Sequence, residues 1–211
     1  MKNIVFIAFW VMGIAIPVHA QDLESNGSPH PHGITSSGLG TTVTAEGKIF
    51  RITGGTEKGG NLFHSFGRFS VHSGEQAVFD DSGIQNTIGR VSGGDYSWIN
   101  GTLKSDAENL FLMNPDGVIF GPHASLDLAG SFHVTTADYL RMGEHERFYA
   151  VPRENEILSM AAPAAFGFLD DEIAPIRFRG GEMRPPENEH ATPLLSLSDG
   201  ETVSVIGGDI E

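Results

Sequence analysis

Short apolar runs alternate with turn-forming residues along most of this chain. From residue 34 onward the runs are rich in Val, Ile, Thr and Phe, and Gly interrupts every candidate helix. β-branched and aromatic residues favour strands, whereas Gly in a helix interior is destabilising. In residues 125–136 and 194–210 apolar side chains occupy alternate positions, which is typical of strands whose two faces have different surroundings. The pattern predicts an all-β fold of many short strands.

Two further stretches, residues 77–91 and 96–105, supply shorter strands with turn residues between them. Residues 137–151 have some helical charge spacing, but Gly143 interrupts it. We therefore expect a loop there, with one helical turn at most. Similar strand patterns return after roughly 20 residues, although too irregularly to define a sequence repeat.

The most informative stretch is residues 109–121, which read NLFLMNPDGVIFG. Its centre has the composition of a type I turn, formed by Asn114, Pro115, Asp116 and Gly117. Asn at the first position can bond to its own backbone, Pro pre-sets φ at the second, and Gly suits the fourth, which often needs a positive φ. The sequence therefore predicts two strands separated by a sharp turn.

The runs on either side of this turn are apolar at consecutive positions, LFLM before it and VIF after it. Strands of that kind are covered on both faces, as in parallel sheets. Strands joined by sharp corners can coil so that each turn stacks on the previous one at about 4.8 Å, which forms a β-helix. The same residues also allow a hairpin or a β-sandwich.

The N-terminus has the pattern of a targeting segment. Residues 4–16 are apolar and follow the single charge of Lys2. This stretch is too short to span a bilayer, and small residues precede a cleavage site after Ala20. We interpret residues 1–20 as a secretory signal peptide read by the Sec machinery; the alternative is an uncleaved anchor.

The remaining chain divides into a leader and one domain. Residues 21–33 are polar and rich in Pro, Gly and Ser, which predicts a flexible leader. Residues 34–211 carry the strand patterns and form the predicted β-domain. The final residues, 201–211, have the pattern of an unfinished coil, so we expect the natural protein to continue.

Composition excludes some partners. The chain has 211 residues, a formal charge of −14 and no cysteine. Nucleic acids and anionic membrane surfaces bind clustered basic residues, so we expect no nucleic-acid partner and no stable membrane insertion. A domain of this size can bury an adequate core without disulfides.

Few residues have the pattern of a catalytic or metal site. His30 and His32 are loosely spaced, with no third ligand nearby in the sequence. Acidic clusters such as Asp80 and Asp81 are more typical of solvated turns than of paired catalytic carboxylates. Residues 54–60 are Gly-rich but lack the order of a phosphate-binding loop. We therefore expect no catalytic residue, no metal and no cofactor.

Three segments together resemble the N-terminal secretion domain of filamentous-haemagglutinin-type exoproteins, the two-partner secretion domain. They are GGTEKGGNLFHSFGRFSV (54–71), NLFLMNPDGVIFG (109–121) and ASLDLAGSFHVTTAD (124–138). The second resembles the family's Asn-Pro-Asn-Gly-Ile/Val motif, with Asp116 in place of the usual Asn. The chain lacks the Asn-Ala-Asn-Pro-Asn-Leu motif that some members carry, so it is similar to the subgroup without it.

The resemblance implies a right-handed parallel β-helix with capping and extra-helical strands. It also implies a function: recognition in the periplasm by a cognate outer-membrane barrel with periplasmic receptor domains, followed by folding outside the cell. The protein would then be secreted or held at the surface of a Gram-negative-type envelope. It would not be an enzyme, since the family's activities, such as adhesion, haemolysis or growth inhibition, reside in the passenger.

The resemblance also selects the residues for transporter recognition or for the fold itself. They are Asn61, Phe63, His64, Phe66, Phe69, Asn114, Pro115, Asp116 and Gly117. Alternating aromatic residues are more typical of a core than of a contact surface. Two other functions remain compatible with the sequence, namely a β-helical carbohydrate-active enzyme and an adhesin module that binds a receptor directly.

Overall fold

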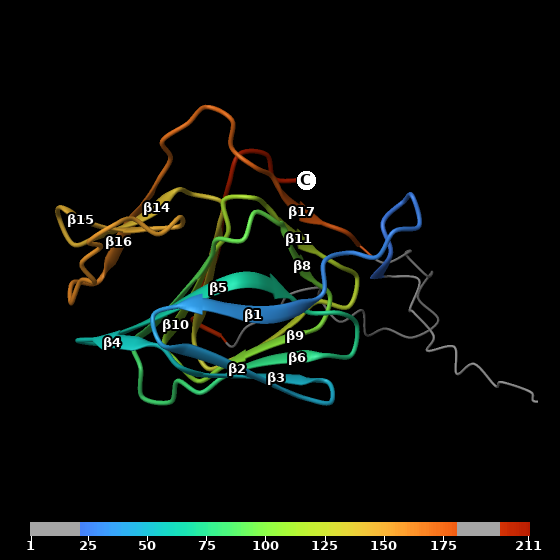
Figure 1. Ribbon diagram of the computed structural model, residues 1–211, viewed down its shortest axis with the longest axis horizontal. Coiled ribbons are helices and arrows are strands. Elements are labelled where there is room, and N and C mark those ends of the chain that lie inside the picture. Colours follow the sequence, from blue (N-terminus) through green and yellow to red (C-terminus); the bar gives the residue numbers. More distant parts are fainter. Residues whose placement is uncertain (1–21, 181–198) are drawn as a thin grey trace, which may run out of the picture.

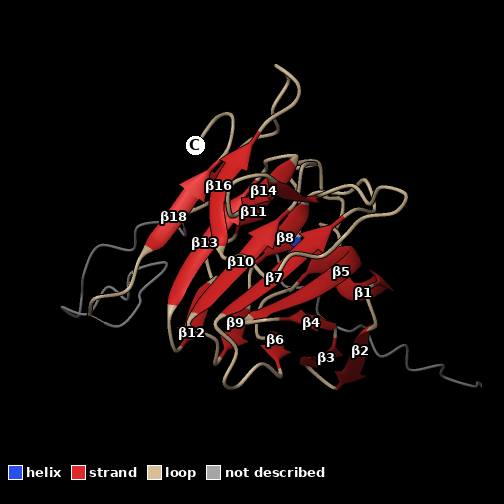
Figure 2. Ribbon diagram, turned by 90° about the vertical axis from the view of Figure 1, so that its left-hand side faces the viewer, coloured by secondary structure: helices blue, strands red, loops and turns tan. Residues whose placement is uncertain are grey.

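The computed structural model describes residues 22–180 and 199–211; the predicted signal peptide, residues 1–20, lies outside this part. Strands and turns make up the described residues, which contain no α-helix (Figure 2). Within these two ranges, no helix is long and apolar enough to cross a membrane. The predicted all-β class is confirmed.

Parallel strands stack into three sheets, which form the faces of a β-solenoid of about three turns (Figures 1 and 2). Face A contains β5 (Asn61–Ser70), β7 (Asn86–Val91), β10 (Asn109–Met113), β13 (Ser131–Thr135) and β18 (Val203–Ile206). Face B contains β8 (Ser97–Ile99), β11 (Val118–Phe120) and β17 (Ile176–Phe178). Face C contains β3 (Ile49–Gly54), β6 (Gln76–Phe79), β9 (Thr102–Ser105) and β12 (Ser125–Leu128). The hairpin and sandwich alternatives are therefore wrong for the stretch around residue 114, where β10 and β11 belong to different faces.

Antiparallel strands close the N-terminal end of the solenoid. β1 (Gly33–Gly38) and β4 (Thr56–Lys58) both pair with β5, and β2 (Thr41–Glu46) pairs with β3. These pairings protect the first sheet edges, which would otherwise offer unpaired backbone groups.

A small antiparallel sheet, here called the side sheet, stands outside face A (Figure 1). It consists of β14 (Tyr139–Met142), β15 (Glu146–Tyr149) and β16 (Pro163–Gly167), with β14 in the centre. The prediction of a loop with one helical turn over residues 137–151 is wrong. Gly143, with φ of 55°, lies in the tight turn between β14 and β15, and the charged residues near it are exposed. The spacing of those charges reflects a solvated hairpin turn rather than a helix face.

Two apolar clusters explain why β10 is apolar at consecutive positions. Leu110 and Leu112 point into the solenoid, where they join a cluster that includes Phe66, Phe120 and Phe132. Phe111 and Met113 point outward into a second cluster, which lies between face A and the side sheet. β10 is thus buried on both faces, as its sequence predicted.

Asparagines mark the start of successive strands on face A. The Asn86 side chain donates to Asn61 Oδ1 at 2.8 Å across 25 residues, and Asn109 donates to Asn86 Oδ1 at 3.1 Å across 23 residues. Ser131 occupies the next position in the same register. These intervals are the coil length, which the irregular recurrence of roughly 20 residues approximated.

Candidate functional site

The predicted turn is a corner of the solenoid held by the buried side chain of Asn114. Asn114 Nδ2 donates to the carbonyl oxygen of Asp95 at 3.0 Å and to Ser97 Oγ at 2.9 Å, both in the preceding coil of the solenoid. Its Oδ1 accepts a hydrogen bond from the backbone N–H of Asp116 at 3.0 Å. The Gly117 N–H donates to the Asn114 carbonyl at 3.2 Å and closes the turn. Asn114 therefore fixes both the corner and the stacking of two coils.

The other corner residues have distinct surroundings. Pro115 is half-buried, and Asp116 is the exposed residue of the four. Gly117 has φ of 112°, a conformation that favours Gly. Burial and the neighbouring Asp95 raise the pKa of Asp116 above its ordinary value, although the backbone N–H of Gly94 opposes this shift. The bond that residue 116 donates to Asn114 Oδ1 comes from its backbone N–H, so an Asp at this position retains the turn.

The five selected residues of β5 are all buried. Phe66 and Phe69 pack inside the solenoid, whereas Phe63 faces the side sheet, with its ring centroid 4.9 Å from that of Phe148. Asn61 Nδ2 donates to the carbonyl oxygens of Ser159 at 3.1 Å and Ala161 at 2.8 Å, next to β16.

His64 is the unusual member of this group. Its Nδ1 lies 3.3 Å from Thr41 Oγ1, and its Nε2 is buried without a hydrogen-bond partner among the described residues. Burial lowers the pKa of His64 to about 4, with Asp81 opposing the shift. The imidazole is therefore held neutral inside the end of the solenoid.

The structure does not bring the two groups of selected residues into one site. β7 lies between β5 and β10 on face A, so the β5 residues and the corner belong to different coils. Both groups contact other parts of the fold rather than a shared cavity.

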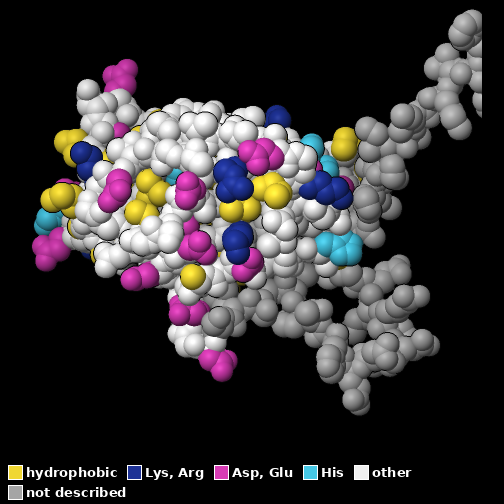
Figure 3. Space-filling view, turned by 90° about the horizontal axis from the view of Figure 1, so that it is seen from below, with side chains coloured by type: hydrophobic (Ala, Val, Ile, Leu, Met, Phe, Trp, Pro, Cys, Tyr) yellow, Lys and Arg dark blue, Asp and Glu magenta, His cyan; other side chains and the backbone are white. Residues whose placement is uncertain are grey.

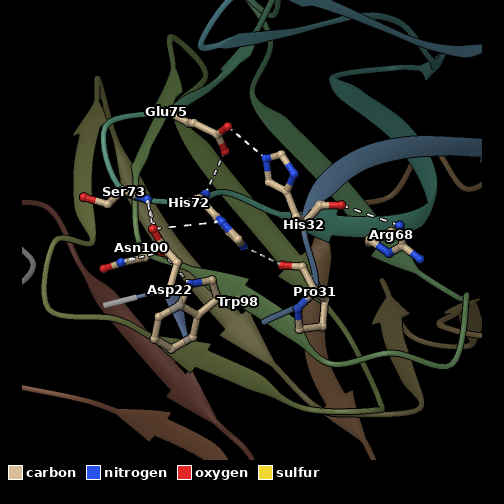
Figure 4. Close-up of polar contacts among 9 residues, drawn as sticks. All are labelled: Asp22, Pro31, His32, Arg68, His72, Ser73, Glu75, Trp98 and Asn100. Carbon is tan, nitrogen blue, oxygen red and sulfur yellow. Dashed lines mark hydrogen bonds and ion pairs between the residues drawn. The ribbon is translucent and has the colours of Figure 1, made fainter. Parts of the chain in front are cut away.

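The N-terminal segment forms a third cluster, which sequence reasoning missed. Residues 22–32, here called the strap, were expected to be a flexible leader, but they lie against the solenoid (Figure 4). Asp22 is buried and accepts hydrogen bonds from Trp98 Nε1 at 3.0 Å, Asn100 Nδ2 at 2.7 Å and the Ser73 N–H at 3.2 Å. Burial alone would raise the pKa of Asp22, but the bonds from Asn100 and Trp98 bring it below the ordinary value.

Three histidines also connect the strap to its surroundings. His30 is buried, and its ring stacks on the indole of Trp98 with centroids 3.7 Å apart. His32 Nε2 donates to Glu75 Oε1 at 2.9 Å, and His72 Nε2 donates to the carbonyl oxygen of Pro31 at 3.1 Å (Figure 4). The rings of His32 and His72 lie 4.4 Å apart.

The surface offers little that resembles a catalytic centre. A cavity of about 460 Å³ lies between face A and the side sheet, lined mainly by amide, aromatic and alanine side chains such as Asn109, Phe111 and Phe166. No group of three His, Asp or Glu side chains in residues 22–180 and 199–211 is arranged to hold a metal ion. On the face seen in Figure 3, acidic and basic side chains are interspersed rather than gathered by sign.

By its fold the protein is a β-solenoid domain, closed at one end by antiparallel strands and extended by a side sheet. The sequence model of the TPS secretion domain family matches residues 32–211, and the chain belongs to this family. The resemblance found in the sequence is thereby confirmed. A search of curated proteins finds no match. The family consists of secretion domains of exoproteins rather than enzymes, and it implies two-partner secretion with an outer-membrane transporter as the partner.

Proposed function

We propose that this domain is the element that a cognate outer-membrane transporter recognises in the periplasm, and that it starts β-helix folding outside the cell. The observation that carries the proposal is the match to the TPS secretion domain over residues 32–211. Residues 1–20 would deliver the chain to the Sec machinery, and the periplasmic receptor domains of the transporter would then bind it.

The architecture supports the folding part of the proposal. Each coil contacts mainly the coils beside it, so folding can begin at the closed N-terminal end and propagate. Asn61, Asn86 and Asn109 bond from coil to coil, which favours correct register as each coil is added. Folding outside the cell would oppose return through the transporter.

The selected residues divide between the two roles in this proposal. Because Asn114 and the phenylalanines of β5 are buried in the folded domain, a transporter would reach their side chains only while the chain is unfolded. We propose that Asn61, Phe63, His64, Phe66, Phe69 and the corner residues 114–117 act in recognition before folding, or through the folding step itself. An extended chain can bind a receptor sheet by adding a strand to it.

Export in a cell that carries the transporter tests this function. The extracellular amount of the protein should fall strongly when residues 109–121 are deleted, and Asn114→Ala should reduce it less. Removal of the transporter should abolish export and leave the chain in the periplasm. Undiminished export of the deletion variant would contradict the proposal.

The two alternative functions have their own readouts. Glycan turnover by the purified domain would favour a carbohydrate-active enzyme. Binding of the isolated domain to host cells would favour a directly binding adhesin. The mixed-sign surface in Figure 3 and the coil-to-coil bonds of the selected residues supply no specific support for either.

A further inference from the structure

The strap spans parts of the fold that are distant in sequence. At one end Asp22 binds Trp98, which lies in β8 on face B, and Asn100, which follows this strand. At the other end His30 Nε2 lies 3.2 Å from Arg179, which follows β17 on the same face. The strap therefore covers the outer side of face B, where Trp98 is only 1% exposed.

The hydrogen bonds around His30 define its protonation state. Tyr96 Oη donates to Glu24 Oε1 at 2.8 Å, so it accepts from His30 Nδ1, which lies 2.7 Å away. Arg179 has only donors, so His30 Nε2 accepts its hydrogen bond. The bound histidine is the neutral Nδ1–H tautomer, and a proton on Nε2 would face the guanidinium directly.

Other charged groups act on this histidine from each neighbouring element. Arg179 and His72 oppose a positive charge on His30, whereas Glu24 and Asp22 favour it. Burial of the His30 ring against Trp98 is the largest influence and opposes the charge, so the pKa of His30 lies below its ordinary value. Nearby, the His32 and His72 rings lie with centroids 4.4 Å apart, next to Glu75 and Asp22.

We propose that residues 22–32 form an acid-releasable strap, in which protonation of His30 breaks its contact with Arg179 and frees the segment from Trp98 while the solenoid stays folded. The solenoid itself does not depend on the strap for its parallel pairings, since all of them join strands from β3 onward. Release would uncover the indole of Trp98 on face B.

The sign of the effect follows from linkage. The bound histidine has the lowered pKa, so the released state takes up more protons as the pH falls below about 6.5. Strap closure is therefore more favourable at neutral pH and weakens on acidification. Between pH 7 and pH 5 the closing equilibrium falls several-fold, with a ceiling of about 25-fold set by the ordinary histidine value.

The chain carries a natural probe for this test. Its two tryptophans are Trp10, within the predicted signal peptide, and Trp98. A purified chain beginning at Gln21 therefore reports on Trp98 alone. Hydrogen exchange of amides that bond across the strap contact, such as the Ser73 N–H that donates to the Asp22 carboxylate at 3.2 Å, measures release of the strap.

Strap protection, corrected for intrinsic exchange rates, should fall between pH 7 and pH 5, and acrylamide quenching of Trp98 should rise, with an unchanged far-UV circular dichroism spectrum. His30→Gln can keep both hydrogen bonds without a charge, and His30→Phe keeps a ring on Trp98. Both variants should lose most of the pH dependence. His145→Gln, which removes an exposed histidine in the β14–β15 turn, should retain it.

Three results would overturn the proposal. One is strap protection that changes less than twofold over this pH range. Another is an undiminished pH dependence in both His30 variants. The third is loss of the β-sheet spectrum together with strap protection, which would indicate unfolding of the whole domain.

Discussion

Arg90 and Glu156 form a buried ion pair at 2.6 Å that joins the solenoid to the side sheet. Arg90 lies on β7, and its guanidinium also donates to the Tyr149 carbonyl oxygen at 2.9 Å and lies 4.7 Å from the ring centroid of Phe148. Glu156 Oε1 in turn accepts from the Tyr149 N–H at 3.2 Å. The outer side of face A and the side sheet are thus linked by charge as well as by apolar packing.

Removal of the arginine should be strongly destabilising. In Arg90→Met the Glu156 carboxylate stays buried without its partner, and loss of one member of such a pair costs roughly 3–5 kcal/mol of unfolding free energy. Urea unfolding followed by circular dichroism measures the loss. The matched control is Arg177→Met, whose pair with Glu211 is about half exposed and should contribute less than about 1 kcal/mol. Equal losses in the two variants would contradict this role of the buried pair.

The corner at Asn114 should depend on the side-chain amide. Asn114→Ala removes the two donated bonds to the preceding coil and leaves the buried Ser97 hydroxyl without this donor, at a cost of about 2–3 kcal/mol. Asp116→Asn provides the control within the same turn. Because burial and Asp95 raise the pKa of Asp116, its charge opposes folding at neutral pH, and neutralisation should stabilise the domain slightly. Thermal unfolding of both variants at pH 7 tests these opposite signs.

Backbone conformation should decide the outcome at Gly117. An added Cβ would lie 3.4 Å from the Pro175 carbonyl oxygen, an ordinary contact, so the penalty comes from φ of 112°. Gly117→Ala should cost about 1–2 kcal/mol in unfolding free energy. Gly180→Ala is the control, since it has open space and an ordinary φ, and it should be nearly neutral in chemical denaturation.

His64 should make global stability depend on pH. Its pKa is about 4 in the fold and about 6.5 when unfolded, so the unfolded state binds more protons between these values. The free energy of unfolding therefore decreases as the pH falls below 6.5, and His64 accounts for a decrease of about 2 kcal/mol between pH 7 and pH 5. His64→Leu should remove that part of the pH dependence in urea unfolding. If the variant retains the full dependence, other groups are responsible.

The sequence predicted the parts of the fold that depend on local pattern. The consecutive apolar residues of β10 indicated burial on both faces, and the composition of residues 114–117 indicated a corner, because turn chemistry and strand pattern act within a few residues. The side sheet was missed because β14 pairs with β16 across a long connection, and Gly143 was interpreted as the interruption of a helical pattern rather than as part of a hairpin turn.

The strap was missed for a related reason. The partners of Asp22, Trp98 and Asn100, lie 76 and 78 residues away in the chain, and only coiling brings them together. Polar composition indicates a mobile leader when such partners cannot be seen. The spacing of His30 and His32, with no third ligand nearby in the sequence, did not indicate their role; in the structure they bond to Tyr96 and Glu75.

The contact between His30 and Arg179 also determines the order of assembly for a chain that emerges N-terminus first. Early coils can stack as soon as their strands appear, but this end of the strap has no complete binding partner until residue 179 has emerged. Full docking of the strap is therefore one of the last events of assembly, and it requires that the coils between the strap and residue 179 have already formed.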